Sequence, residues 1–192
     1  MRKLIVTEFV SLDGVMQAPG GGEPDYPHQG WTFTFERGEE GDRFKLDEVL
    51  ESEAMLLGRV TYDGFAAAWP SMQDEVGFAD KMNSQPKYVV SSTLRDPSWA
   101  NTTVLDGADP IAAVRELRAG EGGPILVHGS ARLAQALIAA DLVDELHLMV
   151  FPIVLGSGKR LFGEVADPRR FRLTRAEQAG ETLITVYEAK RD

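Results

Sequence analysis

The stretch Ile125-Leu-Val-His-Gly-Ser-Ala-Arg-Leu-Ala-Gln-Ala-Leu-Ile138 leads from a short apolar strand into an amphipathic helix through a turn of small residues. Residues 125–128 predict a buried strand, and Gly129 and Ser130 predict the turn. The apolar residues Leu133, Leu137 and Ile138 recur at helical spacing on one face. A strand that runs directly into a helix is the unit from which parallel α/β sheets are built.

The same arrangement of a strand followed by a small-residue turn occurs twice more in the chain. Residues 54–57 predict a strand, followed at once by Gly58-Arg-Val-Thr-Tyr62, and residues 87–91 predict a strand that runs into Ser92 and Thr93. In open α/β sheets, ligands bind beyond the carboxyl ends of the strands, where free amides and helix N-termini can hold anionic groups. Taken together, the three strand ends predict a dinucleotide site.

The remaining pattern predicts an α/β fold with a mixed, mostly parallel central sheet, helices on both faces and an antiparallel C-terminal edge. Asp42 is expected to cap a helix that ends near Glu51, with Leu46, Val49 and Leu50 on its buried face. Further helices are predicted over 76–82 and from Asp109-Pro110 to a left-handed cap at Gly120. Further strands are predicted over 4–10, over 146–154 with an interruption at Pro152, and as an antiparallel pair over 171–176 and 182–188.

Length and composition favour one globular domain over residues 1–192 and exclude several classes of protein. The net charge of −10 argues against nucleic-acid binding. No apolar run approaches the length of a membrane span, and the N-terminal stretch is typical of a first strand, which indicates a cytoplasmic protein. The chain has no cysteine and only three histidines, none at ligand spacing from another, so we expect no metal site.

The order and spacing of the motifs resemble a known family over nearly the whole chain. The motifs are Ser11-Leu-Asp-Gly14, Gly58-Arg-Val-Thr-Tyr62, Met82-Asn83, Pro86-Lys-Tyr-Val-Val-Ser91, His128-Gly-Ser130, Pro152-Ile-Val-Leu-Gly-Ser-Gly158 and Leu161-Phe162. This set is similar to the dihydrofolate reductase-like fold, in the branch that contains the reductase domain of the bifunctional deaminase-reductase of riboflavin biosynthesis. The zinc deaminase domain of that enzyme cannot be built from this chain, so the resemblance is to a stand-alone reductase.

The resemblance implies an NADPH site, whose residues lie at the three strand ends. It places Gly58, Arg59 and Thr61 at the cofactor phosphates, Gly129 and Ser130 at the pyrophosphate, and Ser91 and Ser92 near the adenosine ribose. Arg95 is expected to assist with the 2′-phosphate. Only Arg59 and Arg95 favour NADPH over NADH.

Two carboxylates are candidate catalytic residues, and each has a simpler alternative. By resemblance, Asp13 lies where related reductases contact the substrate beside the nicotinamide, but it is also typical of a turn residue that bonds its own backbone. Asp42 precedes Gly58 by about the spacing of the pterin-binding carboxylate in folate reductases, and it also suits a simple helix cap. Candidate substrate contacts are Trp31, in a long loop over 17–41 of the kind that often covers a site, and Gly156.

The resulting hypothesis is an NADPH-dependent reductase of a small heterocyclic substrate that resembles 5-amino-6-(5-phosphoribosylamino)uracil reductase of riboflavin biosynthesis. One alternative is a folate or pterin reductase of the dihydrofolate reductase type, for which Asp42 is the best support. Another is a non-catalytic nucleotide-binding module that keeps the cofactor site. The apolar terminal strands would expose a sheet edge, so we also expect a homodimer.

Overall fold

The eight strands form one mixed sheet, in the order β4-β3-β2-β5-β1-β6-β8-β7. The computed structural model describes residues 1–191. The first six strands in that order are parallel, whereas β8 pairs antiparallel with β6, and β7 pairs antiparallel with β8. The strands are β1 (Leu4–Ser11), β2 (Ala54–Gly58), β3 (Lys87–Val90), β4 (Thr102–Leu105), β5 (Ile125–His128), β6 (Glu145–Phe151), β7 (Arg170–Ala179) and β8 (Thr182–Lys190). This topology confirms the predicted α/β class, its mostly parallel sheet and its antiparallel edge.

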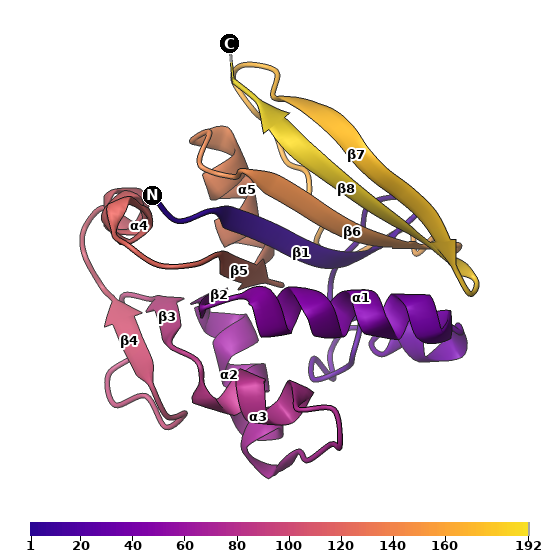
Figure 1. Ribbon diagram of the computed structural model, residues 1–192, viewed down its shortest axis with the longest axis horizontal. Coiled ribbons are helices and arrows are strands. Elements are labelled where there is room, and N and C mark those ends of the chain that lie inside the picture. The colour runs from indigo at the N-terminus through magenta and orange to yellow at the C-terminus, as the bar shows by residue number, and fades with distance from the viewer. Residues whose placement is uncertain (192) are drawn as a thin grey trace.

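Helices cover both faces of this sheet (Figure 1). The helices are α1 (Gly38–Glu51), α2 (Arg59–Ala68), α3 (Phe78–Ser84), α4 (Pro110–Ala119) and α5 (Ala131–Ala139), with short 3-10 turns η1 (Trp31–Thr34) and η2 (Trp69–Ser71). One apolar cluster joins the sheet to α4 and α5, and a second joins the opposite face to α1, α2 and α3. No helix within residues 1–191 is both long and apolar enough to cross a membrane.

Several predicted boundaries differ from the structure. Helix α1 begins at Gly38, four residues before the predicted cap, because the chain turns at Gly38 with a positive φ of 65°. Gly120, expected as a left-handed cap, is extended with φ −64° and ψ 175°. The short edge strand β4 was not predicted, because its polar sequence Thr-Thr-Val-Leu resembles a loop. Asp109 does cap α4 as predicted, since its side chain accepts from the N–H of Ala112.

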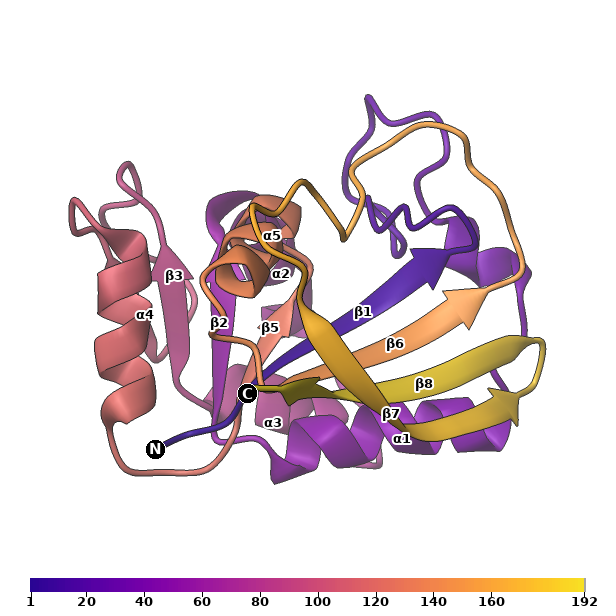
Figure 2. The ribbon, with the colours of Figure 1, turned by 90° about the horizontal axis from the view of Figure 1, so that it is seen from above.

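A third apolar cluster holds the long loop after β1 against the end of the sheet. Figure 2 shows that β1 and β6 point toward two loops, one following each strand, which lie side by side. The loops are joined by hydrogen bonds from Tyr26 to the carbonyl of Ser157 and from Lys159 N–H to Gln17. Trp31 and Phe151 pack edge to face in this cluster. The loop is therefore part of the folded core at this end of the sheet.

A buried lysine holds the β3 side of the sheet together. The side chain of Lys87 has no exposed surface, and its ammonium donates to the carbonyls of Asn83, Gln85 and Ala100 at 2.7, 2.8 and 3.1 Å. It also lies 4.4 Å from the centroid of the Trp99 ring. Burial lowers the pKa of Lys87 to about 8, so the ammonium is still largely charged at neutral pH. The ammonium thereby joins the end of α3 to the start of β3 and to the segment before β4.

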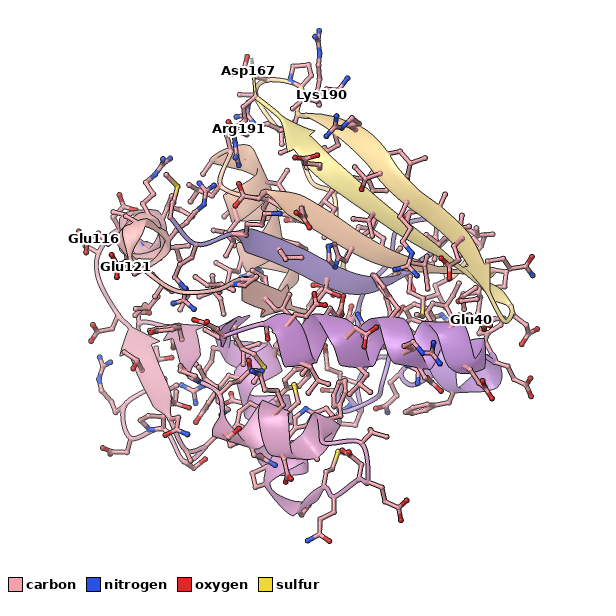
Figure 3. All side chains as sticks on the ribbon, in the orientation of Figure 1. Glu40, Glu116, Glu121, Asp167, Lys190 and Arg191 are labelled. Carbon is pink, nitrogen blue, oxygen red and sulfur yellow. The ribbon has the colours of Figure 1, made fainter. Side chains whose placement is uncertain are left out.

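Replacing Lys87 with methionine should therefore destabilise the fold. Lys87→Met removes the donor of three carbonyls, and we expect a loss of about 3 kcal/mol in the free energy of unfolding, measured by urea denaturation. Lys190→Met is the control, because Lys190 lies exposed at the periphery (Figure 3) and should change stability by less than about 0.5 kcal/mol. Equal changes in the free energy of unfolding for the two variants would show that the buried ammonium has no special role in stability.

Candidate active site

The carboxyl ends of the parallel strands lie along one edge of the sheet, as predicted for a ligand site. Strand β1 pairs with β5 only as far as Thr7 and His128, but it continues beside β6 as far as Ser11 and Phe151. Residues 8–11 of β1 therefore have a strand neighbour on the β6 side only. The open side of β1 faces the turn after β5, where Gly129 and Ser130 lie.

Ser130 joins the ends of β2 and β5 directly. Its hydroxyl accepts from the N–H of Gly58 at 2.7 Å, and its own N–H donates to the hydroxyl of Thr61 at 2.9 Å. Gly129 and Ser130 both have positive φ, 53° and 61°. A Cβ on Gly129 would lie 2.8 Å from the Thr61 hydroxyl oxygen, so glycine is required for this approach. Four of the five residues predicted at the cofactor phosphates, Gly58, Thr61, Gly129 and Ser130, thus form one connected unit.

Two helices begin at this unit, and neither has a side-chain cap. Gly58 precedes α2 and Ser130 precedes α5, and no side chain accepts from the first amides of either helix. The first amides of a helix have no partner within the helix, and together with the helix dipole they attract anions. Here two such ends lie side by side, held together by the bonds of Ser130.

Both arginines predicted at the cofactor lie around the turn after β3. Arg59 pairs with Asp63 at 2.8 Å, and its guanidinium lies 3.4 Å from the hydroxyl of Thr93. Arg95 donates to the carbonyl of Ser92 at 3.0 Å. The Arg59 side chain is 39% exposed and that of Arg95 is 66% exposed, so both can reach a ligand.

The two serines of this turn have different surroundings. The Ser91 hydroxyl is buried and accepts from the N–H groups of Thr93 and Leu94, so Ser91 shapes the turn. Ser92 is exposed. Of the two, Ser92 is therefore the better placed to meet a ribose hydroxyl.

Asp13 and Gly156 are brought into direct contact. The Asp13 carboxylate accepts from the hydroxyl of Ser11 at 2.7 Å and from the N–H groups of Leu155 and Gly156 at 3.1 and 2.9 Å. The bond from Ser11, followed by the two backbone bonds, lowers the pKa of Asp13 to about 2. Asp13 is thus ionised at neutral pH, and it ties the loop after β6 to the end of β1. This geometry suits a structural role better than the predicted catalytic one.

Asp42 and Trp31 do not lie where the sequence placed them. Asp42 lies inside α1 rather than at its start, and its side chain is 66% exposed and paired with Arg37 at 2.7 Å. Its exposure and its pairing with Arg37 remove the geometric support for both a catalytic Asp42 and a folate reductase. Trp31 is buried, and its indole N–H donates to the carbonyl of Gln17. The indole is part of the core and does not cover a site.

The sequence interpretation missed a polar cluster beneath α1. The Lys45 ammonium donates to the hydroxyl of Thr7 at 2.6 Å and pairs with the Glu48 carboxylate at 2.5 Å. Thr7 in turn donates to Glu48 at 2.6 Å. The other Glu48 oxygen lies 3.1 Å from Nδ1 of His147. Although burial opposes its ionisation, the charge of Lys45 and the bonds from His147, Lys45 and Thr7 lower the pKa of Glu48 to about 2.

Two buried polar atoms beside this cluster have no partner within the described part of the chain. They are Oε1 of Glu8 and Nε2 of His128, which lies opposite Thr7 in the β1–β5 register. Burial raises the pKa of Glu8 well above its ordinary value. Burial, together with the charge of Lys45, lowers the pKa of His128 to about 4. Both shifts favour the uncharged form of the group, and both atoms have free hydrogen-bonding capacity.

A sequence signal for this cluster exists. Thr7 and Glu8 interrupt an otherwise apolar strand, and Glu48 directly precedes the buried Val49 in α1.

The predicted buried face of helix α1, with Leu46, Val49 and Leu50, was wrong in part, because Leu50 is 44% exposed whereas Gly41, Phe44 and Glu48 are buried. Residues 1–191 contain no group of three or more His, Asp or Glu side chains placed to hold a metal ion.

Comparison with known families agrees with this geometry. Residues 2–185 match the family described as the RibD C-terminal domain. The chain belongs to the RibD C-terminal domain family. This membership confirms the family resemblance seen in the sequence motifs, and it makes a reductase of the riboflavin-biosynthesis type the activity class of the family.

Relatives of this RibD C-terminal domain protein are similar over nearly their whole length. Two Bacillus subtilis (strain 168) proteins of uncharacterised function match: YyaP is 29% identical, covering 97% of this chain and 95% of its own, and YwjB is 30% identical, covering 97% of each. A candidate riboflavin biosynthesis protein from Shewanella sp. PV-4 has the same fold, with a TM-score of 0.75 at 22% identity over 98% of this chain and 99% of its own. A pyrimidine reductase-like protein from Corynebacterium diphtheriae has a TM-score of 0.62 at 14% identity over 100% and 93%.

The close approach at Gly129 leads to a prediction with an internal control. Gly129→Ala would force a Cβ against Thr61 and strain a positive φ, so we expect a loss of about 1–3 kcal/mol in the free energy of unfolding. Gly64→Ala, in α2 with open space around the new Cβ, should instead stabilise by about 0.5–1 kcal/mol. Chemical denaturation of both variants measures the two signs, and a neutral Gly129→Ala would contradict the described turn.

Proposed function

We propose that this protein is an NADPH-dependent reductase of a small heterocyclic substrate, of the type of 5-amino-6-(5-phosphoribosylamino)uracil reductase. The observation that carries the proposal is the pair of uncapped helix N-termini, α2 and α5, joined through Ser130. A pyrophosphate is the group that two adjacent sets of free amides suit best. Membership of the RibD C-terminal domain family supports the same activity class.

The residues present fit such a cofactor. Gly129, with its positive φ, allows the backbone to approach a phosphate closely, and Gly58 and Thr61 lie against the same turn. The guanidinium groups of Arg59 and Arg95, both at the turn after β3, suit a 2′-phosphate. The open side of β1 after Thr7, where Glu8 has an unpartnered carboxyl oxygen, suits the carboxamide of a nicotinamide. The bound cofactor would supply a hydride.

The protein's own groups would hold and orient the substrate beside that position. The face of the sheet under α1 offers the Lys45 ammonium, the Thr7 hydroxyl and the free Nε2 of His128, with the Phe65 ring 6.1 Å from the His128 ring. Asp13 holds the loop after β6 through Gly156 and thereby closes the other end of the site. Catalysis of hydride transfer depends chiefly on such positioning.

NADPH binding is the first test of this proposal. Titration of the purified protein, followed by nicotinamide fluorescence, should show tight binding of NADPH and weaker binding of NADH. Arg59→Met should weaken NADPH binding by about 10–100-fold, because it removes one charged contact to the 2′-phosphate, and should leave NADH binding nearly unchanged. An equal loss of affinity for NADPH and NADH in the variant would contradict a contact between Arg59 and the 2′-phosphate. Absence of cofactor binding to the native chain would contradict the reductase proposal.

Turnover distinguishes the two remaining alternatives. Oxidation of NADPH with a pyrimidine substrate but not with dihydrofolate is the expected result. Oxidation with dihydrofolate would favour a folate reductase. NADPH binding without oxidation across a panel of pterins and pyrimidines would favour a non-catalytic nucleotide-binding module.

We also propose that the protein forms a homodimer through the α5 side of its antiparallel edge. A cavity of about 370 Å³ lies there between α5, β6, β8 and the segment before β7, and its lining includes Phe162, Val165 and Phe171. Phe162 and Leu173, on the same side, are 54% and 52% exposed. Exposed apolar groups gathered on one sheet face favour burial against a second copy related by a twofold axis.

Sedimentation velocity tests this assembly. The native chain should sediment as a dimer at micromolar concentration, and Phe162→Asp should shift it to the 21.1 kDa monomer, because a carboxylate would be buried unpaired at the interface. Val60→Asp, at an equally exposed apolar residue on α2, is the control and should leave the dimer intact. A native chain that sediments only as monomer would contradict the proposal.

A further inference from the structure

Five side chains of alternating charge form a continuous chain under α1. Lys3 lies 2.6 Å from one Glu145 oxygen, and the other Glu145 oxygen lies 3.0 Å from Nε2 of His147. Nδ1 of His147 lies 3.1 Å from Glu48, and Glu48 lies 2.5 Å from the Lys45 ammonium. The chain therefore runs from the surface at the start of β1, across β6, to the middle of the candidate active site.

His147 is held in its charged form by the two carboxylates. Each ring nitrogen faces one carboxylate oxygen, an arrangement that only a doubly protonated imidazolium satisfies. Although burial opposes the charge, the bonds to Glu145 and Glu48 raise the pKa of His147 above its ordinary value. The bond with His147 and, on the other oxygen, the bond with Lys3 lower the pKa of Glu145 to about 2, although burial opposes its ionisation. Both carboxylates stay ionised at neutral pH.

With His147 charged, the chain holds three cations, Lys3, His147 and Lys45, and two anions, Glu145 and Glu48, for a net charge of +1. Burial shifts the pKa values of the neighbours Glu8 and His128 toward their uncharged forms, upward for Glu8 and to about 4 for His128, so neither is counted in the sum. The whole protein, in contrast, carries −10. Figure 3 shows acidic residues such as Glu40, Glu116 and Asp167 far apart on the periphery. The cluster is thus a positive region within an acidic molecule.

At the candidate site, this series of ion-paired side chains ends with Lys45. Its ammonium uses two protons on Thr7 and Glu48, and it lies 4.9 Å from the centroid of the Phe9 ring. A third proton remains for a ligand, and the side chain is 13% exposed. His128, across the β1–β5 register from Thr7, adds the buried unpartnered Nε2. An ammonium and a neutral imidazole are complementary to an oxygen that carries negative charge, whereas the hydroxyl proton of Thr7 is donated to Glu48.

We propose that Lys45 and His128 form a subsite for an anionic oxygen of a planar heterocycle, that Thr7 positions Lys45 directly, and that His147 positions it through Glu48. This proposal rests on the proposed reductase function and names the kind of group that the substrate presents. The Phe9 ring lies beside the subsite, with the Lys45 ammonium 4.9 Å and the Arg37 guanidinium 5.5 Å from its centroid. His147 does not touch the ligand, and it acts by holding the Glu48 carboxylate that holds Lys45.

The charge of His147 gives the subsite a pH dependence. Loss of the His147 proton changes the cluster from +1 to 0, so affinity for an anion falls as pH rises through the folded-state pKa of His147. The charged groups packed around His147 are Glu48 and Lys45 on α1, Glu145 on β6 and Lys3 before β1. Farther out, Arg175 and Glu177 on β7 pair with each other, as do Arg172 on β7 and Glu188 on β8. Within residues 1–191, neither His28 nor His128 takes part in this chain of ion pairs.

The experiment compares two pyrimidines of the same shape and different charge. Barbiturate is a planar monoanion at neutral pH, whereas uracil is neutral, and calorimetric titration of the full chain at pH 6.5 measures both. We expect barbiturate to bind more tightly than uracil, and Lys45→Met to weaken barbiturate by about 10–100-fold with little change for uracil. Lys190→Met, at an exposed lysine outside the site, is the matched control and should leave both affinities unchanged.

The positioning role of His147 has its own readout. Barbiturate affinity of the native chain should fall between pH 6.5 and 9, and His147→Gln should give a low affinity that no longer varies over this range. Should that variant fail to fold, ring-nitrogen NMR of the native chain still tests the role. His147 should titrate above its ordinary pKa, barbiturate should raise that pKa further, and the Nε2 signal of His128 should shift on binding.

Several results would overturn the subsite. They are equal binding of barbiturate and uracil, an unaffected Lys45→Met variant, or a barbiturate affinity that does not vary with pH. NADPH titration on the same samples distinguishes failure of the subsite proposal from failure of the reductase proposal. NADPH binding without preference for barbiturate overturns the subsite alone, whereas barbiturate preference without NADPH binding upholds the subsite and removes the reductase.

Discussion

Two hydrogen bonds of Ser130 hold the starts of α2 and α5 together, and the arrangement of the candidate active site depends on them. The hydroxyl of Ser130 fixes the N–H of Gly58, and its N–H is fixed by Thr61. Because β2 and β5 are neighbours in the sheet, the helices that follow them would start near each other in any case. The Ser130 bonds make that proximity specific, and the positive φ of Gly129 allows it. Without this turn the free amides of the two helices would not converge on one anionic group.

Thr7 has a comparable place on the face of the sheet that α1 covers. It lies at the last residue pair between β1 and β5, so β1 beyond it is open on one side. In the register it lies between His128 and His147, and its hydroxyl contacts both Lys45 and Glu48. The end of β5 therefore determines two things at once: where a ring can enter beside β1, and which polar groups it meets there. The geometry of the sheet and the chemistry of the site have a common origin in this register.

Local sequence signals were sufficient for the fold and for the turns at which we propose that the cofactor binds. The turns at Gly58 and Gly129 are each readable within a few residues, because a strand, a glycine and a helix follow one another directly. The polar cluster was missed because its members, Lys3, Thr7, Lys45, Glu48 and the pair in β6, come from three distant segments. Only the parallel β1–β6 register brings Thr7 beside His147, and no local pattern specifies that register. The contacts of Asp13 could not be predicted for the same reason, since its partners at 155 and 156 are distant in sequence.

The buried charge chain is difficult to explain as a device for stability alone. Removing charges from water costs free energy that ion pairing repays only in part, and apolar residues of similar size are often at least as stabilising. Thr7, Glu48 and His147 interrupt a face where Ile5, Val49 and Met149 pack well. The raised pKa of His147 stabilises the fold below its unfolded pKa, and this contribution is lost as pH rises through the folded-state pKa. A contribution that weakens toward neutral and higher pH is a poor reason to keep a polar core. Holding a positive group at a fixed place beside the open side of β1 is a better reason to keep these polar residues.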